Sequence, residues 1–190
     1  STVNERLISL AISNPTCAAA FTDCGISQLL VAFGQLVDHD STLLSGCGDM
    51  FDPILIDITN DTVLSPGENG TISLTRKAFF VDVDGNKQYN SGITQWLDAS
   101  FLYGSDEARS LQLRTLAGGA MKMWPQNSGN LLPVNVFGED ADNQPLDRES
   151  CTFVCGDIRC QEQPVLTAWH TAFLRLHNIL AAEVQDLHPT

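Results

Sequence analysis

One long amphipathic segment constrains the fold of this chain more than any other feature. Between residues 164 and 187, apolar side chains recur at spacings of three and four, which is the period of a helix with one buried face. Pro164 suits the first helical turn, where its missing N–H has no partner to lose. We therefore expect a long helix over Pro164–Leu187 whose apolar stripe packs on other segments: Leu166, Trp169, Ala172, Phe173, Leu176, Leu180 and Val184.

Two further segments also have helical spacing. Residues 27–39 place apolar side chains one, three and four positions apart, and Ser27 can cap the start of a helix there. A second helix is expected from Ser105 through Leu116, because two glycines follow at 118–119 and glycine often ends helices. Together with the long C-terminal segment, these elements predict a mainly α fold.

The segments between these helices predict long loops and little β structure. Residues 45–70 and 127–148 are rich in residues that favour turns and loops. The segment Thr71–Val83 alternates weakly and predicts one short strand, followed by a turn at residues 83–86. Loops of this length inside a compact domain indicate function, bound ions, disulfides or missing parts of the fold.

Composition excludes some classes of partner. The chain has 190 residues, of which 43% are apolar, so it is large enough to bury a core. Its formal charge of −13 repels phosphate backbones and anionic lipid surfaces. No apolar run reaches the roughly 20 residues that a membrane span requires. We expect neither nucleic-acid binding nor a membrane span.

Cysteines and glycosylation signals favour an oxidising, secreted setting. Two Asn-x-Ser/Thr triplets, at residues 60–62 and 69–71, fall among residues typical of exposed loops. An even number of cysteines is compatible with disulfides, although the sequence does not give their pairing. The six cysteines are Cys17, Cys24, Cys47, Cys151, Cys155 and Cys160.

Two polar patterns can carry acid–base chemistry. Gln35, Asp38 and His39 share one face of the helix expected over residues 27–39. A histidine beside two carboxylates, here Asp38 and Asp40, should have a raised pKa, although a polar helix end with a surface histidine is the alternative. Arg159 and Glu162 share a face in a helical turn, where an ordinary surface ion pair is the alternative.

A third pattern places oxygen atoms at alternate positions. Thr94, Asp98 and Ser100 supply side-chain oxygens, and the backbone carbonyl of Trp96 can add another. Hard oxygen ligands with this spacing suit Ca²⁺. The alternative is an ordinary loop, in which threonine, aspartate and serine are also common.

Taken together, four segments resemble the animal haem peroxidase family, in the order that the family has them. They run Gly34–Asp40, Trp96–Ser105, Gly156–Arg159 with Glu162, and His170–Leu180 with Leu-His-Asn at 176–178. The resemblance extends from about Phe33 to the C-terminus. It implies that residues 1–190 are the distal, N-terminal part of a single haem peroxidase domain, with a helical core and long loops.

The resemblance implies a role for each matching residue. His39 matches the distal histidine, which moves a proton from hydrogen peroxide to the departing oxygen. Arg159 matches the distal arginine, whose cation stabilises charge as the O–O bond breaks. Gln35 matches the distal glutamine, which holds water or a halide. Asp38 and Glu162 match the carboxylates that form ester bonds to haem b.

The resemblance also implies a Ca²⁺ site beside the distal histidine. Because Asp40 follows His39, a cation bound to Asp40 would lock the helix end and aim the imidazole. Trp96 would contribute only its backbone carbonyl. The implied ligands are Asp40, Thr94, Trp96, Asp98 and Ser100.

Two departures from the family pattern limit what this chain can do alone. Gln163 stands where one member of the family has a methionine that makes a third link to haem, which glutamine cannot form. No residue matches the proximal histidine that binds the haem iron. His170, His177 and His188 fall outside that motif, so we expect the first two to pack against neighbouring segments and His188 to mark the helix end. We expect a second polypeptide, cleaved from the same precursor, to carry the proximal histidine. The alternative is that the proximal part is missing.

The function that follows is a secreted or granule-stored haem peroxidase subunit. It would reduce hydrogen peroxide and oxidise a halide, thiocyanate or phenolic donor, once the proximal part is supplied. The first alternative is a peroxidase-like adhesion or matrix protein with little catalysis. The second is a calcium-binding structural fragment without haem.

Overall fold

The computed structural model describes residues 27, 29–44, 53–59, 61, 70–75, 77–136 and 152–189. The chain divides into two compact units. One comprises Ser27–Leu43 and Ser91–Thr190, and the other comprises the rest of the chain. All residues that the sequence predicts to act on peroxide, haem or Ca²⁺ fall in the first of these units, which we call the site unit.

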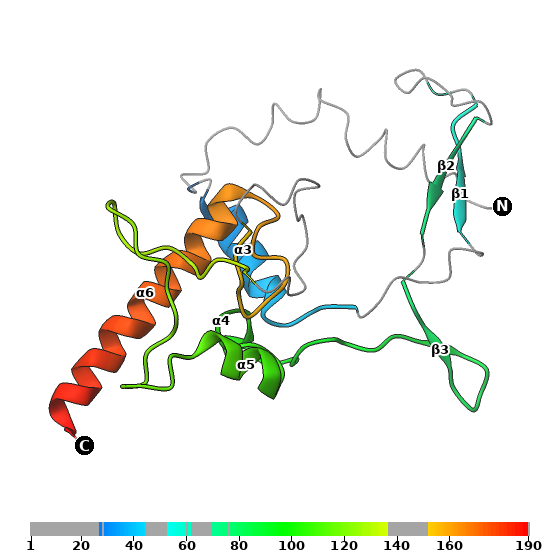
Figure 1. The fold of residues 1–190 in the computed structure, drawn as a ribbon. Helices are drawn as coiled ribbons and strands as arrows, with labels where there is room; N and C mark the ends of the chain where they lie inside the picture. Colours follow the sequence, from blue (N-terminus) through cyan, green and yellow to red (C-terminus); the bar gives the residue numbers. More distant parts are fainter. Residues whose placement is uncertain are drawn as a thin grey trace. The chain divides into compact units, whose positions relative to one another are not determined.

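Two helices that pack on each other form the frame of the site unit. Helix α3 covers Leu29–His39 and helix α6 covers Pro164–Leu187, so both predicted helices are confirmed (Figure 1). Ser27 caps α3, since its Oγ accepts from the backbone N–H of Leu29 at 3.2 Å. The rings of Phe33 and Trp169 meet edge to face across the two helices, with centroids 5.4 Å apart.

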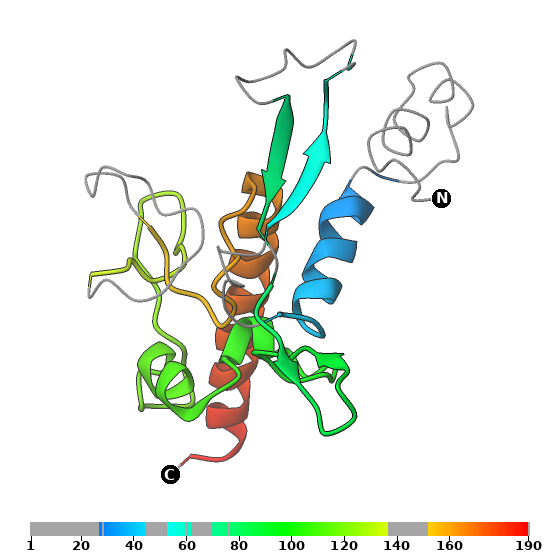
Figure 2. The ribbon, with the colours of Figure 1, turned by 90° about the vertical axis from the view of Figure 1, so that its right-hand side faces the viewer.

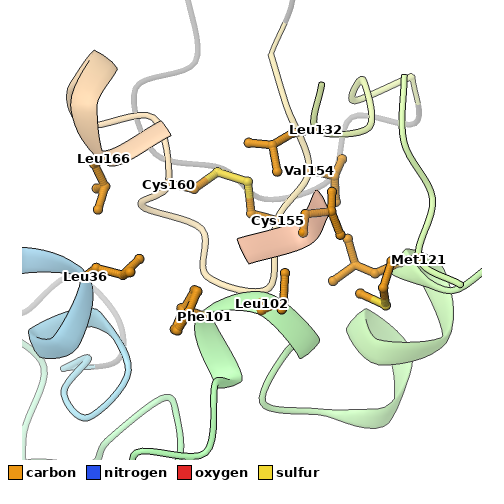
Figure 3. Packing of buried hydrophobic residues seen from close by; sticks show 11 residues of the cluster. Leu36, Phe101, Leu102, Met121, Leu132, Val154, Cys155, Cys160 and Leu166 are labelled. Atoms are coloured by element: carbon orange, nitrogen blue, oxygen red, sulfur yellow. A yellow bond between two sulfur atoms is a disulfide. The ribbon is translucent and has the colours of Figure 1, made fainter. Parts of the chain in front are cut away.

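The core of the site unit lies between α3, α6, two short helices and the segments that follow them. Helix α4 covers Ser100–Tyr103 and α5 covers Glu107–Leu113. Apolar side chains from all these parts interlock (Figure 3), and burying them supplies the main driving force for folding. The cluster contains Leu36, Phe101, Leu102, Leu113, Met121, Leu132, Val154, Cys155, Cys160, Leu166 and Leu174.

Helix α5 is shorter than the sequence predicts. It starts one residue after its cap Asp106 and ends at Leu113, not at Leu116. The reason is tertiary pairing, because Arg114 is extended and pairs with Met121 in an isolated antiparallel bridge. Leu116 has φ +60°, in the left-handed region, which is incompatible with a continuing helix.

The second unit contains two small antiparallel pairs of strands. Strand β1, Ile54–Asp57, pairs with β2, Thr71–Leu74, and Figure 2 shows the two strands side by side. The register sets Ile54 opposite Leu74. Strand β3, Phe80–Val81, pairs with β4, Lys87–Gln88, around the predicted turn. The expectation of only loops over residues 45–70 was therefore wrong at β1, and the single strand over residues 71–83 is two strands.

Little β structure and a helical site unit agree with the predicted fold class. Among the described residues, no helix is both long and apolar enough to cross a membrane. The acceptor asparagines of both glycosylation triplets, Asn60 and Asn69, and four of the cysteines, at 17, 24, 47 and 151, lie outside the described residues. Most of the loop predicted over residues 127–148 also lies outside them, while residues 127–136 contain only isolated bridges.

Candidate active site

The packing of α3 on the start of α6 brings three predicted site residues together. Gln35 and His39 lie one helical turn apart on α3, and Glu162 lies two residues before α6. The Nε2 of Gln35 donates to Glu162 Oε2 at 2.7 Å. The Nε2 of His39 lies 3.6 Å from the same oxygen. A carboxamide, an imidazole and a carboxylate therefore converge from segments more than 120 residues apart.

Arg159 joins this group through a partner that the sequence did not single out. Its Nε donates to Asp157 Oδ1 at 2.9 Å and its Nη2 to Asp157 Oδ2 at 2.7 Å. Nη2 also donates to the backbone carbonyl of His39 at 3.2 Å. The surface ion pair considered for Arg159 and Glu162 is therefore replaced by a bidentate pair with Asp157, which is 2% exposed. The sequence signal that could have predicted this ion pair is the carboxylate of Asp157, two positions before Arg159.

The histidine is held in its neutral form. The pKa of His39 is lowered from 6.5 chiefly by burial and then by the Arg159 cation, which together outweigh Asp157, Glu162 and Asp38. The expectation of a raised pKa was wrong because His39 is only 3% exposed, so its charged form loses hydration. Its Nδ1 has no hydrogen-bond partner within the described part of the chain and lies 3.9 Å from Asp157 Oδ1. A neutral imidazole with a free nitrogen can accept a proton.

Asp38 lies at the edge of the group. Its side chain is exposed, and its Oδ1 accepts from the hydroxyl of Thr42 at 2.9 Å. Glu162 is also partly accessible, with a side chain 34% exposed. Both carboxylates can therefore be reached by a large group bound against this face, whereas the buried Asp157 cannot.

Gln163 links the group to the start of α6, a role that the sequence did not indicate. Its Oε1 accepts from the backbone N–H of Val165 at 3.0 Å, which caps the helix. Its Nε2 donates to Gln35 Oε1 at 3.2 Å. With Gln35 donating to Glu162, the three side chains form one directed chain of hydrogen bonds, so the orientation of the Gln35 carboxamide is set.

The predicted Ca²⁺ ligands gather beside the C-terminal end of α3. Asp40, 4% exposed, accepts from the hydroxyl of Ser100 at 3.1 Å and from the backbone N–H of Ala99 at 3.0 Å. Asp98 Oδ1 accepts from the Thr94 hydroxyl at 3.0 Å and from the Ser100 N–H at 3.1 Å. Two carboxylates and two hydroxyls thus form one connected group of hard oxygen ligands.

The surroundings of this oxygen group add two observations. Trp96 lies in the same loop with its indole 76% exposed, so the side chain itself takes no part in the core. Among the described residues, no three His, Cys, Asp or Glu side chains cluster closely enough to hold a metal ion. Any Ca²⁺ at this place would therefore depend on the hydroxyls and backbone carbonyls as well as on Asp40 and Asp98.

The three histidines near the C-terminus pack against neighbouring segments or end α6, although both ring nitrogens of His170 have no hydrogen-bond partner among the described residues. His170 is 1% exposed, and its ring meets that of Phe101 edge to face at 5.3 Å. Burial lowers the pKa of His170 from 6.5 to about 4. His177 bonds the Tyr103 hydroxyl at 2.9 Å and the Gly119 carbonyl at 3.0 Å, while His188 ends α6.

The arrangement fits a haem-binding face in its donor chemistry. An imidazole, a guanidinium and a carboxamide, which can handle peroxide, lie together, and two accessible carboxylates border them. The two nitrogens of His39 face different sides of the group, with Nδ1 towards the buried Asp157 and Nε2 towards the partly accessible Glu162.

Comparison with known proteins gives one consistent result. The sequence model of the family described as animal haem peroxidase matches residues 2–190. Peroxinectin A of Dictyostelium discoideum is 40% identical over 115 residues, which cover 57% of this chain and 21% of that protein. Eosinophil peroxidase of Mus musculus is 32% identical over 173 residues, covering 86% of this chain and 23% of that protein.

A solved structure has the same fold. Peroxidase A from Dictyostelium discoideum superposes with a TM-score of 0.65 at 30% identity, over 85% of this chain and 34% of that one. The chain thus spans 21%, 23% and 34% of the lengths of these three relatives.

Proposed function

The chain belongs to the animal haem peroxidase family, and from that membership we propose that it forms the peroxide-handling half of a haem peroxidase. The observation that carries the proposal is the convergence of Gln35, His39 and Glu162 between α3 and α6, with Arg159 bonded to the backbone of His39. The reaction would reduce hydrogen peroxide to water and oxidise a halide, thiocyanate or phenolic donor.

His39 would move the proton. Haem, when bound, supplies the redox chemistry of the reaction. His39 is neutral at physiological pH because burial and Arg159 lower its pKa, so its Nε2 can take a proton from hydrogen peroxide and return it to the departing oxygen. Nε2 is the nitrogen that lies towards the accessible Glu162, whereas Nδ1 lies towards the buried Asp157.

Arg159 would stabilise the negative charge that grows as the O–O bond breaks. Its guanidinium is 11% exposed and is held by two hydrogen bonds to Asp157 and one to the His39 carbonyl. A charge fixed before the reaction needs no reorganisation during it, which is why such groups are effective. The Nη2 bond to the carbonyl of His39 also keeps the cation beside the imidazole.

The carboxylates and the glutamines would hold the cofactor and a small ligand. Asp38 and Glu162 would form the two ester links to haem b, since both are accessible at the edge of the group. Gln35 would place a water or a halide, with its carboxamide oriented by Gln163. Because Gln163 has no sulfur, a third link through that residue is not available.

Ca²⁺ would bind the oxygen group at the end of α3. Asp40, Thr94, Asp98, Ser100 and the carbonyl of Trp96 would be the ligands. In support, the four side chains are already connected by hydrogen bonds, so little rearrangement is needed to receive a cation. Ca²⁺ on Asp40 would fix the orientation of His39, its neighbour in sequence.

A further polypeptide would complete the enzyme. Five large apolar side chains on the C-terminal half of α6 are about half exposed or more, and such surface usually contacts a partner. We propose that the remaining part of the peroxidase domain covers this surface and brings the proximal histidine, either as a second chain or as a continuation of this one. The residues concerned are Leu176, Ile179, Leu180, Val184 and Leu187.

Secretion or storage in a granule is the setting we propose, because the Cys155–Cys160 disulfide forms and persists in oxidising compartments. The direct test of the function is an absorption spectrum of the native protein beside denaturing mass spectrometry. A haem band, with haem mass retained on this chain, supports the proposal and the esters. A native protein without haem contradicts it and favours an adhesion or structural role.

A further inference from the structure

The loop that carries Arg159 is closed at both ends by a disulfide. Cys155 and Cys160 are bonded to each other, five positions apart in sequence. The four residues between them are Gly156, Asp157, Ile158 and Arg159. The bond lies inside the apolar core, with Cys155 5% and Cys160 1% exposed (Figure 3). The guanidinium proposed to act on peroxide is thus attached to the residue directly beside a buried crosslink.

The contacts of the loop explain why its ends need fixing. Within the loop, the Arg159 side chain and Asp157 bond to each other, so these two hydrogen bonds do not themselves attach the loop to the rest of the protein. The loop has no regular secondary structure to hold it. An unconstrained segment of this kind gains conformational entropy whenever it detaches. Closing it covalently removes most of the detached conformations.

Besides the bond from Arg159 Nη2 to the His39 carbonyl, three contacts outside the loop define the position that the crosslink preserves. The Asp157 N–H donates to the Phe101 carbonyl at 3.0 Å, and the Thr167 hydroxyl donates to the Cys160 carbonyl at 2.8 Å. A Cβ added at Gly156 would lie 2.5 Å from the carbonyl oxygens of Ser100 and Phe101, so the loop backbone lies directly against α4. The loop therefore rests on α4 at one end and on α6 at the other.

We propose that the Cys155–Cys160 disulfide positions Arg159 for its reaction with peroxide by holding the two ends of the loop together permanently. The inference rests on the proposed function for the role of Arg159. Cys155 and Cys160 are positioning residues, since they would act only through the guanidinium. Both sulfurs are buried, so a reductant reaches them only when the core opens, and the bond is not placed to act as a switch. The crosslink also leaves no thiol at position 160, beside a residue that handles an oxidant.

The first test measures the loop itself. Cys155→Ala with Cys160→Ala is compared with wild type in the full native protein by hydrogen exchange of the backbone amides at 156–160. The control is Leu113→Ala, which removes buried apolar surface of the same core from α5. We expect exchange roughly tenfold faster or more in the double variant and little change in the control, because loss of the crosslink should let the loop open locally, without unfolding of the core. Equal exchange in wild type and double variant would overturn the proposal.

The second test asks whether the disulfide acts through Arg159. Loss of the bond should slow the reaction with hydrogen peroxide roughly 100-fold, the scale expected for small misplacement of a reacting group. In an Arg159→Ala background the same loss should have almost no further effect, since the group to be positioned is gone. An equal slowing in both backgrounds would mean that the cysteines act only on general stability.

Two safeguards keep the tests decisive. Where the double variant does not fold, wild-type protein is treated with a phosphine reductant, and alkylation of Cys155 and Cys160 identifies the opened bond. Unchanged hydrogen exchange at residues 156–160 after reduction of the disulfide would contradict its role in positioning the loop. Wild type that fails to react with peroxide refutes the proposed function, whereas the exchange measurement still decides whether the disulfide holds the loop.

Discussion

Two loops approach α4, and they are closed by different means. The loop at 155–160 carries Arg159 and is closed by a covalent bond. The loop at 94–100 carries the oxygens around Asp40 and is closed by hydrogen bonds between carboxylates, hydroxyls and backbone N–H groups. The first fixes a permanent cation, whereas the second fixes the end of the helix that holds His39. If both proposals hold, the cation would be positioned independently of solution conditions, whereas the orientation of the imidazole would depend on a bound Ca²⁺.

The largest expected effect is at the centre of the covalently closed loop. Asp157→Ala leaves the guanidinium of Arg159 without its bidentate partner in a site where that side chain is 11% exposed. Removing one member of a buried ion pair typically costs about 3–5 kcal/mol of unfolding free energy. Urea denaturation of the variant measures this loss.

The control for that prediction is Asp186→Ala, at an exposed position of α6. An exposed substitution should change the unfolding free energy by about 0.5 kcal/mol or less. Similar losses for the two variants would show that the closed loop does not depend on its internal ion pair.

Acid should lower the unfolding free energy of the core around α4, which both loops contact. His170 packs on Phe101 in α4, and its folded pKa of about 4 lies below the 6.5 of the unfolded chain. Between these values the unfolded state binds more protons, so stability is full above pH 6.5 and falls as the pH drops towards 4. The difference corresponds to about 3 kcal/mol. Unfolding free energies measured at pH 7 and pH 4.5 should show most of this loss.

The matched variant is His170→Leu, which keeps an apolar side chain of similar size in the core. It should lose much of the stability change between pH 7 and pH 4.5, because no imidazole remains to be protonated there. An unchanged pH dependence would assign the acid sensitivity to other groups.

Removal of Ca²⁺ by a chelator should affect the loop at 94–100 and not the loop at 155–160. If Ca²⁺ binds the loop at 94–100, saturation at about 100 times its dissociation constant stabilises the protein by about 2.7 kcal/mol. Excess chelator should therefore lower the melting temperature and speed hydrogen exchange at residues 94–100, while exchange at residues 156–160 stays slow. Asp98→Ala should give the same loss and no response to chelator. Equal melting temperatures of the wild-type protein with and without chelator would contradict Ca²⁺ binding at this loop.

The smallest expected effect lies at Gln163, which follows the covalently closed loop. Gln163→Leu removes both the helix cap and the bond to Gln35, and loss of a cap costs about 1 kcal/mol. Gln163→Asn keeps a good capping residue but is too short to reach Gln35 as well. We expect near-normal thermal stability for the asparagine variant, with weaker halide binding in both variants. Normal halide binding in both would show that Gln35 needs no orientation.

Sequence was sufficient where structure is set locally. The periodicity of residues 164–187 and 27–39 predicted α6 and α3, since both helices follow their own amphipathic patterns. Strand β1 was missed because its partner β2 begins 14 positions after β1 ends, and only pairing makes Ile54–Asp57 a strand. The early end of α5 likewise depends on the pairing of Arg114 with Met121.

Family resemblance, and not physical chemistry alone, singled out the residues of the candidate site. Spacing placed Gln35, Asp38 and His39 on one face of a helix, but nothing local placed Glu162 opposite them. Burial reversed the expected pKa shift of His39, since the depth of a side chain is a tertiary property. The part played by Asp157 follows from a turn that folds the chain back on itself between residues 157 and 160.

The most direct test of the central claim is the rate at which the complete, haem-loaded protein reacts with hydrogen peroxide in a stopped-flow experiment. We predict that His39→Ala slows this reaction by roughly 100- to 10,000-fold, the usual contribution of a general acid–base, and leaves the haem band unchanged. His188→Ala, an exposed histidine at the end of α6, should react like wild type. A His39→Ala variant that reacts as fast as the His188→Ala control would contradict the assignment of this face as the peroxide site.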